Sequence, residues 1–179
     1  MLTETQRVEL LAIARAAIGG WPGSAPGGRA TWPLAGAFVT LRKRGELRGC
    51  IGHVEADQPL DVTVARVAVA SARTDPRFPS VSPDEMGEMA IEISVLGPLE
   101  RITGAGEIDI GRHGVVVERV FHRGLLLPQV AVEHGWSADV FLSQGCVKAG
   151  LPPDAWKHGA TLWRFEAEVF GESGSDEAA

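Results

Sequence analysis

The sequence predicts an α+β fold in which helices are mixed with an antiparallel sheet. Helical and strand patterns both occur along the chain, without an internal repeat of fixed period. Neighbouring strands are separated by short polar turns, which join antiparallel strands, whereas parallel strands need long crossovers. The chain has 179 residues, of which 45% are hydrophobic, so one domain can bury its own core.

The first element is expected to be a helix. Thr3 and Gln6 have the spacing of a capping box, and apolar residues recur at helical spacing until Gly19-Gly20 ends the run. The Gly/Pro-rich stretch from Gly19 to Ala30 predicts a loop.

A hairpin and a helix should follow. Residues 37–41 and 47–52 have strand composition and flank a polar turn that contains Gly45. Pro59 suits the first turn of the next helix, which must end before the prolines of the turn from Thr74 to Pro79.

The rest of the chain predicts further short elements. Their signals are a capping box, alternating apolar residues, paired apolar runs and a serine N-cap. They indicate a short helix after Ser82, a strand over 91–95, a hairpin from 115–117 and 125–127, a helix from Ser137 to Ala149, and a strand over 161–170.

Composition excludes several classes of protein. Seventeen basic residues against 23 acidic ones give a net charge of −6, which argues against a nucleic-acid-binding surface. No apolar run is long enough for a membrane span, and the N-terminus lacks the pattern of a signal peptide. We therefore expect a cytoplasmic protein with two reduced cysteines, organised as one domain over residues 1–172 and a disordered tail at 173–179.

The segment Leu47-Arg48-Gly49-Cys50-Ile51-Gly52 is the strongest candidate for chemistry. Side chains alternate along a strand, so Arg48, Cys50 and Gly52 are expected on one face. Gly49 and Gly52 leave room near the sulfur for a ligand or another backbone. A guanidinium about 6 to 7 Å along the strand favours a thiolate. The pattern indicates a nucleophilic or ligand-binding Cys50, and a small cysteine in a tightly packed strand is the alternative.

A thiol nucleophile needs a base, and the chain has five histidines. His113 lies in a predicted turn just before a strand, where an imidazole could be held at the rim of a cleft. Gln129 or Glu133 could orient such a histidine, and their four-residue spacing would also let them line a pocket. His113 is therefore the candidate base, although sequence spacing does not establish that it lies near Cys50.

Asp75 and Arg77 belong to a compact charged turn. Arg77 could hold an anionic group, or the two residues could form the internal ion pair of an Asx turn. Cys50 and His53 offer two metal ligands, but no second pair follows at zinc-finger spacing. Motifs for metal hydrolysis, a P-loop and dinucleotide binding are also missing from the sequence, so we predict no metal and no cofactor.

Taken together, these segments resemble the AMMECR family, whose prokaryotic members are called protein A of the AmmeMemoRadiSam system. Six motifs occur in order over about residues 5 to 172, which is more specific than any single motif. The matching stretches are Leu47–Gly52, Asp75–Pro79, Glu92–Leu96, His113-Gly114, Leu125–Trp136, and Lys148–Leu151 with Trp156.

The resemblance implies a mixed α/β domain with two interlocked sublobes. For prokaryotic relatives it also implies two partners, a Memo-like protein that resembles metal-dependent extradiol dioxygenases and a radical SAM enzyme. The motif around Cys50 is the hallmark of the family and implies a catalytic or binding role. His113 matches the family's His-Gly step, whereas His53 stands where relatives carry another polar residue and inherits no role.

Two functions remain open from the sequence. In the first, the protein is an enzyme or enzyme subunit in which Cys50 is a nucleophile or acid/base, Arg48 assists it and His113 is the base. In the second, a cleft around Arg48, Cys50 and Arg77 binds a small anionic ligand or a partner protein without catalysis.

Overall fold

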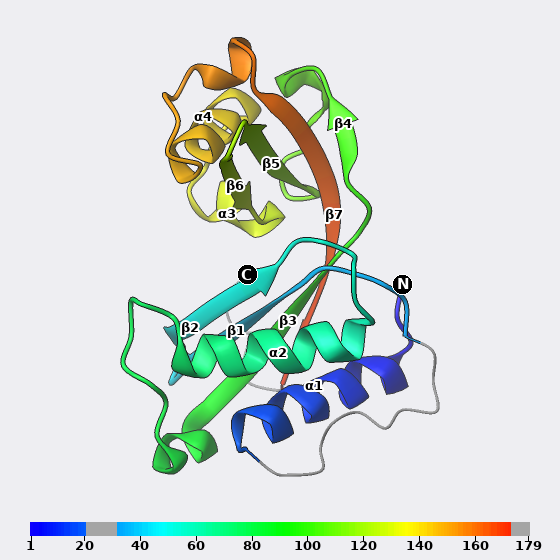
Figure 1. The fold of residues 1–179 in the computed structure, drawn as a ribbon, viewed down its shortest axis with the longest axis vertical. Helices are drawn as coiled ribbons and strands as arrows, with labels where there is room; N and C mark the ends of the chain where they lie inside the picture. Colours follow the sequence, from blue (N-terminus) through cyan, green and yellow to red (C-terminus); the bar gives the residue numbers. More distant parts are fainter. Residues whose placement is uncertain (21–31, 173–179) are drawn as a thin grey trace. The chain divides into compact units, whose positions relative to one another are not determined.

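The computed structural model describes residues 1–20 and 32–172 and confirms the predicted α+β fold with antiparallel strands (Figure 1). The chain divides into two compact units. Unit 1 contains Met1–Leu96 and the chain from Glu168 onward, and unit 2 contains Gly97–Ala167. The chain thus leaves unit 1 and later returns to it, as expected for two interlocked sublobes. The predicted tail at 173–179 and most of the predicted loop between residues 19 and 30 lie outside the described residues.

Unit 1 packs two helices on one face of an antiparallel sheet (Figure 1). Strand β1 is central and pairs with β2 on one side and β3 on the other, so β2 stands at the end of the strand order. The elements of this unit are α1 (Glu4–Ile18), β1 (Ala37–Lys43), β2 (Glu46–His53), α2 (Leu60–Arg73), the 3-10 helix η1 (Pro83–Glu88) and β3 (Met89–Leu96). The last residues of β7 (Thr161–Gly171) also belong to this unit.

Both predicted capping boxes form in unit 1. The Thr3 hydroxyl accepts the backbone N–H of Gln6 at 3.3 Å, and the Gln6 side chain accepts the backbone N–H of Thr3 at 2.9 Å. Ser82 and Glu85 form the second box, on η1. Each box satisfies two backbone donors that the helix itself leaves unpaired.

The turn between β1 and β2 fixes their register. Its two residues, Arg44 and Gly45, have φ angles of 53° and 85°, the left-handed conformation that tight hairpin turns of type I′ require. The turn starts the pairing with Lys43 opposite Glu46, and a one-residue shift in register beyond Arg42 then places Thr40 opposite Cys50. The turn and this shift together determine which residue lies opposite Cys50.

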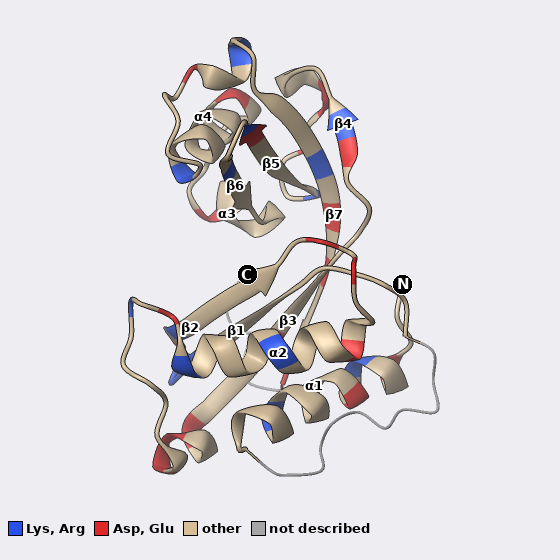
Figure 2. Ribbon diagram, in the orientation of Figure 1, with Lys and Arg blue, Asp and Glu red and all other residues tan. Residues whose placement is uncertain are grey.

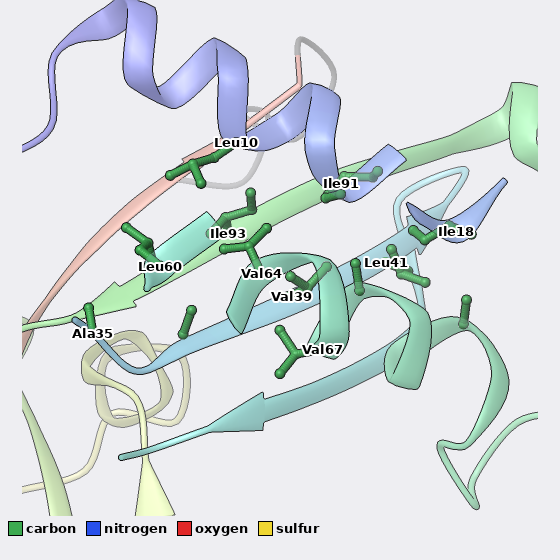
Figure 3. Close-up of a cluster of buried hydrophobic side chains, with 14 of the residues drawn as sticks. Leu10, Ile18, Ala35, Val39, Leu41, Leu60, Val64, Val67, Ile91 and Ile93 are labelled. Carbon is green, nitrogen blue, oxygen red and sulfur yellow. The ribbon is translucent and has the colours of Figure 1, made fainter. Parts of the chain in front are cut away.

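The core of unit 1 lies between the helices and the sheet (Figure 3). Strands β1 and β3 contribute Val39, Leu41, Ile91 and Ile93, each fully buried. Helices α1 and α2 cover them with apolar residues that include Leu10, Leu60 and Val64. Burying one such side chain contributes about 1.5 to 3 kcal/mol, so this face of the sheet is committed to packing. Polar residues that alternate with these positions face the other side.

Unit 2 has a second core and contains the other predicted elements. The hairpin, the helix after Ser137 and the last strand are confirmed. The elements are β4 (Glu100–Ile102), the 3-10 helix η2 (Ala105–Glu107), β5 (His113–Arg119), β6 (His122–Leu126), α3 (Pro128–Glu133), α4 (Ala138–Lys148), the 3-10 helix η3 (Ala155–Lys157) and most of β7. The sequence did not predict α3 or β4, because elements of six and three residues carry too little periodicity.

Charges are dispersed over both units. Figure 2 shows that both units contain Lys and Arg as well as Asp and Glu. Within residues 1–20 and 32–172, every helix is too short or too polar to cross a lipid bilayer.

Candidate functional site

The turn that follows α2 holds the backbone of Cys50. The N–H of Cys50 donates to Oδ2 of Asp75 at 2.9 Å, and Nη2 of Arg77 donates to the carbonyl oxygen of Cys50 at 3.2 Å. These two backbone groups point away from β1, toward the outer edge of β2. The turn thus replaces a neighbouring strand at this residue and fixes its backbone.

Asp75 and Arg77 form the internal ion pair that the sequence left as one of two alternatives. Nε and Nη2 of Arg77 donate to the two carboxylate oxygens at 2.9 and 2.7 Å. The Asp75 side chain is 2% exposed and that of Arg77 is 51% exposed. The hydrogen bond from Arg77, supported by the backbone N–H groups of Cys50 and Arg77, holds the pKa of Asp75 well below its usual range against the effect of burial.

Cys50 is a half-buried residue, and the hydroxyl of Thr40 donates to its sulfur at 3.3 Å. The backbone groups of Cys50 point away from β1, so Thr40 and Cys50 are a non-hydrogen-bonded pair, the pair type that brings side chains closest together. The Thr40 residue is 7% exposed. The sequence reasoning missed Thr40, because the register of the two-residue turn without the bulge would place Val39 opposite Cys50.

Arg48 lies in the same strand but binds other partners. Its Nε and Nη2 donate to Glu85 at 3.2 and 3.1 Å, and its Nη1 donates to the carbonyl of Pro79 at 2.8 Å. The side chain is 14% exposed. Arg48 first, then the Ser82 N–H and Lys43, hold the pKa of Glu85 well below its usual range. The charge of Arg48 is therefore paired with Glu85.

An irregularity in β2 explains the direction of Arg48. Leu41 pairs with Gly49 whereas Arg42 pairs with Leu47, so Arg48 is the extra residue of a bulge. Bulges re-aim side chains, and the expectation that Arg48 and Cys50 project together assumed a regular strand. The guanidinium bonded to Cys50 is that of Arg77.

Packing fills the space beside both glycines of the motif. A Cβ atom on Gly49 would lie 2.2 Å from the carbonyl oxygen of Ser71 in α2. A Cβ atom on Gly52 would lie 2.3 Å from the ring of Phe38. The sequence predicted that these glycines leave room for a ligand or for another backbone. In the described residues, other protein atoms lie close to both glycines.

His113, Gln129 and Glu133 belong to unit 2. His113 is 5% exposed, and its Nδ1 accepts the backbone N–H of Asp109 at 3.0 Å. The Nδ1 lone pair of His113 is therefore engaged by a backbone donor within unit 2. Gln129 is half-buried in α3 and Glu133 is exposed at its end. The structure thus groups the predicted residues in two sets, with Arg48, Gly49, Cys50, Gly52, Asp75 and Arg77 in unit 1.

The second cysteine provides a contrast. Cys146 is fully buried in the core of unit 2, and burial raises the pKa of its thiol. Both cysteines are free. Among the described residues, no group of three or more His, Cys, Asp or Glu side chains is arranged to hold a metal ion.

Residues 12–170 match the family model described as AMMECR1. The chain belongs to the AMMECR1 family. Similar AMMECR1-family relatives include a protein of Methanothermobacter thermautotrophicus, 47% identical over 146 residues that cover 78% of this chain and 76% of the relative. Protein TK0174 of Thermococcus kodakarensis is 45% identical over 152 residues, covering 79% and 74%. The crystal structure of uncharacterized protein PH0010 from Pyrococcus horikoshii is similar with a TM-score of 0.82 and 39% identity, covering 92% of this chain and 90% of that one.

In this AMMECR1-family chain, most of the motif residues have a packing role. The two glycines admit α2 and an aromatic ring, Arg48 holds η1, and Asp75 with Arg77 holds the edge of β2. Cys50 differs from them, because it is half-buried and its sulfur accepts the hydroxyl of Thr40. The motif therefore fixes the surroundings of one free thiol.

Proposed function

We propose that this AMMECR1-family protein uses Cys50 as a thiol nucleophile, as an enzyme or as the subunit of one. The observation that carries the proposal is the placement of the sulfur. The residue is half-buried, its sulfur accepts the hydroxyl of Thr40 at 3.3 Å, and its backbone N–H and carbonyl are bonded to Asp75 and Arg77. The sulfur would attack an electrophilic centre of a substrate and form a covalent intermediate.

Two physical effects support this use of the thiol. A fixed backbone reduces the motion that must be frozen before attack, which is a known source of rate enhancement. The guanidinium of Arg77 also places a positive charge beside Cys50, because its Nη2 donates to the carbonyl oxygen of that residue at 3.2 Å. The hydrogen bond with Asp75 raises the pKa of Arg77, so this charge is retained.

The test is selective alkylation of the folded full-length protein with iodoacetamide, followed by measurement of intact mass. We expect one adduct in the wild type and none in Cys50→Ser over the same time. The chain has two cysteines, so Cys50→Ser retains Cys146 as an internal control. An unmodified wild type, or equal modification of the two proteins, would contradict the proposal.

One observation favours a second function, which is binding without catalysis. Arg77 is half-exposed, and its Nη1 makes no hydrogen bond to the described residues, so it could donate to an anionic group. The ligand would be a small anion or an acidic segment of the Memo-like or radical SAM partner that family resemblance implies. Calorimetry with the Memo-like protein separates the two functions. Binding without catalysis predicts that Cys50→Ser binds normally and Arg77→Ala binds weakly, whereas equal loss in both variants would favour thiol chemistry.

The proposed chemistry requires reduced thiols, which a cytoplasmic location would maintain. Both cysteines are free in the structure. We retain the cytoplasm as the proposed location on this basis.

A further inference from the structure

The turn between β5 and β6 exposes two large apolar side chains. Arg119 pairs with His122 across the hairpin, so Val120 and Phe121 are the two residues of the turn. Phe121 is 97% exposed and Val120 is 78% exposed, and within residues 1–20 and 32–172 the only large hydrophobic residue more exposed than this pair is Met1. Neither side chain of the turn therefore contributes to a core.

The backbone of the turn makes valine an unusual residue at this position. Val120 has a φ angle of 58° at the first position of the turn. Hairpin turns with a positive φ there usually contain glycine, asparagine or aspartate, and a β-branched residue is strained in this conformation. Glycine would relieve the strain, and any of the three would expose less apolar surface. Since valine does not help the turn to form, its presence indicates a role outside the fold.

The rest of the hairpin is held firmly. Val115, Val116 and Val117 of β5 are fully buried. In β6, the Nδ1 atom of His122 lies 3.1 Å from the carbonyl oxygen of Ala149, the residue at which α4 ends. The turn is thus presented on a fixed base, so little conformational freedom is lost when its side chains bind a target.

Cationic side chains flank the two apolar residues. Arg119 and Arg123 come from the two strands of the hairpin, and Lys148 precedes Ala149 at the end of α4; all three are exposed. The only carboxylate of β5 and β6 is that of Glu118, which is half-buried. The hairpin and the end of α4 therefore contribute more positive than negative charge around the turn, although the whole chain has a net charge of −6.

We propose that the hairpin tip, defined as Arg119, Val120, Phe121, Arg123 and Lys148, binds the surface of a membrane that contains anionic lipids. Val120 and Phe121 enter the interfacial layer, and the three cations contact the lipid headgroups. Apolar side chains with basic neighbours are the combination that holds a protein at an anionic interface. The tip belongs to unit 2 and Cys50 to unit 1, so this proposal is independent of the proposed thiol chemistry.

The charge and exposure of the tip favour a membrane over other occupants. A tip-to-tip contact with a second copy of the chain would bring the same cations together, and like charges repel. Two exposed side chains on a turn need a matching pocket in a protein partner, whereas a lipid interface accepts them without one. The cytoplasmic leaflet of a membrane is negatively charged, which agrees with the proposed cytoplasmic location.

The experiment is co-sedimentation of the full-length protein with phosphatidylcholine vesicles that contain or lack phosphatidylserine. Each Lys or Arg near an anionic surface strengthens binding about fivefold, so we expect binding at least about tenfold stronger to the vesicles with phosphatidylserine. Phe121→Ser should weaken binding about tenfold, because the ring is no longer buried in the interface. Lys148→Gln should weaken it about fivefold, because one cation is lost.

The variant Val120→Gly separates binding from stability. Glycine adopts the backbone conformation of the turn without strain, so the variant should fold as stably as the wild type while binding vesicles about threefold more weakly. Val8→Ala is the matched control, because Val8 in α1 is another exposed valine, with 58% exposure. It should bind vesicles within about twofold of the wild type.

The outcomes decide between a membrane and another target. Loss of vesicle binding in Phe121→Ser and Val120→Gly, but not in Val8→Ala, supports the proposal when thermal unfolding shows that all three variants are folded. A wild type that does not sediment with phosphatidylserine vesicles would overturn it, and the tip would then fit a protein partner. Equal binding to the two kinds of vesicle, or unchanged binding in both turn variants, would also overturn it.

Discussion

Replacement of Asp75 by asparagine is the sharpest perturbation of the proposed support for Cys50. The side chains have the same shape, so the change removes a negative charge and one acceptor oxygen. The carboxylate accepts four hydrogen bonds, two on each oxygen, from the backbone N–H groups of Cys50 and Arg77 and from Nε and Nη2 of Arg77. Asparagine keeps one of the two oxygens and has an NH₂ group in place of the other. Two of the four N–H donors therefore face another donor and lose their acceptor.

The expected loss of stability is about 3 kcal/mol. A hydrogen bond to a charged group contributes about 1.5 to 3 kcal/mol, and an unpaired buried N–H costs about 1 to 3 kcal/mol. We count the backbone N–H of Cys50 in full and discount the Arg77 bonds, because the guanidinium is half-exposed and water replaces part of its interaction. For a chain of this size, about 3 kcal/mol lowers the melting temperature by about 6 to 12 °C.

The effect of Asp75→Asn should depend on pH with a definite sign. The pKa of Asp75 is lowered in the folded protein, so its stabilising effect is complete above the unfolded value of about 3.9. Below about pH 4 the unfolded chain takes up a proton that the folded protein does not, and the stabilisation shrinks as the pH approaches the folded pKa. The difference in unfolding free energy between wild type and variant should be constant from about pH 5 to 8 and decrease below about pH 4.

Urea unfolding followed by tryptophan fluorescence measures this difference, because the chain contains five tryptophans. Asp154→Asn is the control, since Asp154 is exposed and its side chain makes no capping hydrogen bond. It should change stability by less than about 0.5 kcal/mol. A loss below about 1 kcal/mol in Asp75→Asn, or a loss that stays constant down to pH 3, would refute the reasoning.

Two further predictions concern the same segment. Gly49→Ala should lower stability by about 3 kcal/mol, because the new methyl group meets the backbone of α2. The control Gly87→Ala has open space at its Cβ and should change stability by less than about 0.5 kcal/mol. Similar urea midpoints for the two variants would contradict the packing role of Gly49. Arg48→Ala should reduce stability by about 2 kcal/mol but leave the rate of Cys50 alkylation within about twofold, whereas Arg77→Ala should slow alkylation about threefold or more. If Arg48→Ala slowed alkylation more than Arg77→Ala does, Arg48 rather than Arg77 would be the cation that assists the thiol.

The elements that the sequence predicted are those whose signals are local. The capping boxes at Thr3 and Ser82 and the turn at Gly45 act over a few residues, so their residue types suffice to identify them. Helix α3 could not be predicted, because its six residues span less than two turns.

The candidate site was predicted in part, for reasons that are also physical. The motif identified Cys50, Asp75 and Arg77, because a free thiol and a charged turn are visible as residue types. The partner of the thiol depends on register, and the bulge at Arg48 interrupts the alternation from which the direction of that side chain was predicted. Thr40 has no motif of its own, and its role follows only from its place opposite Cys50.

The central claim is that the chain holds one thiol in position for reaction and keeps the other in the core. The most direct measurement is peptide mapping after brief treatment of the folded protein with iodoacetamide, which compares modification of Cys50 and Cys146 in the same molecule. We predict modification of Cys50 alone, with Cys146 modified only after denaturant is added. Modification of both cysteines at equal rates, or of neither before unfolding, would contradict the account.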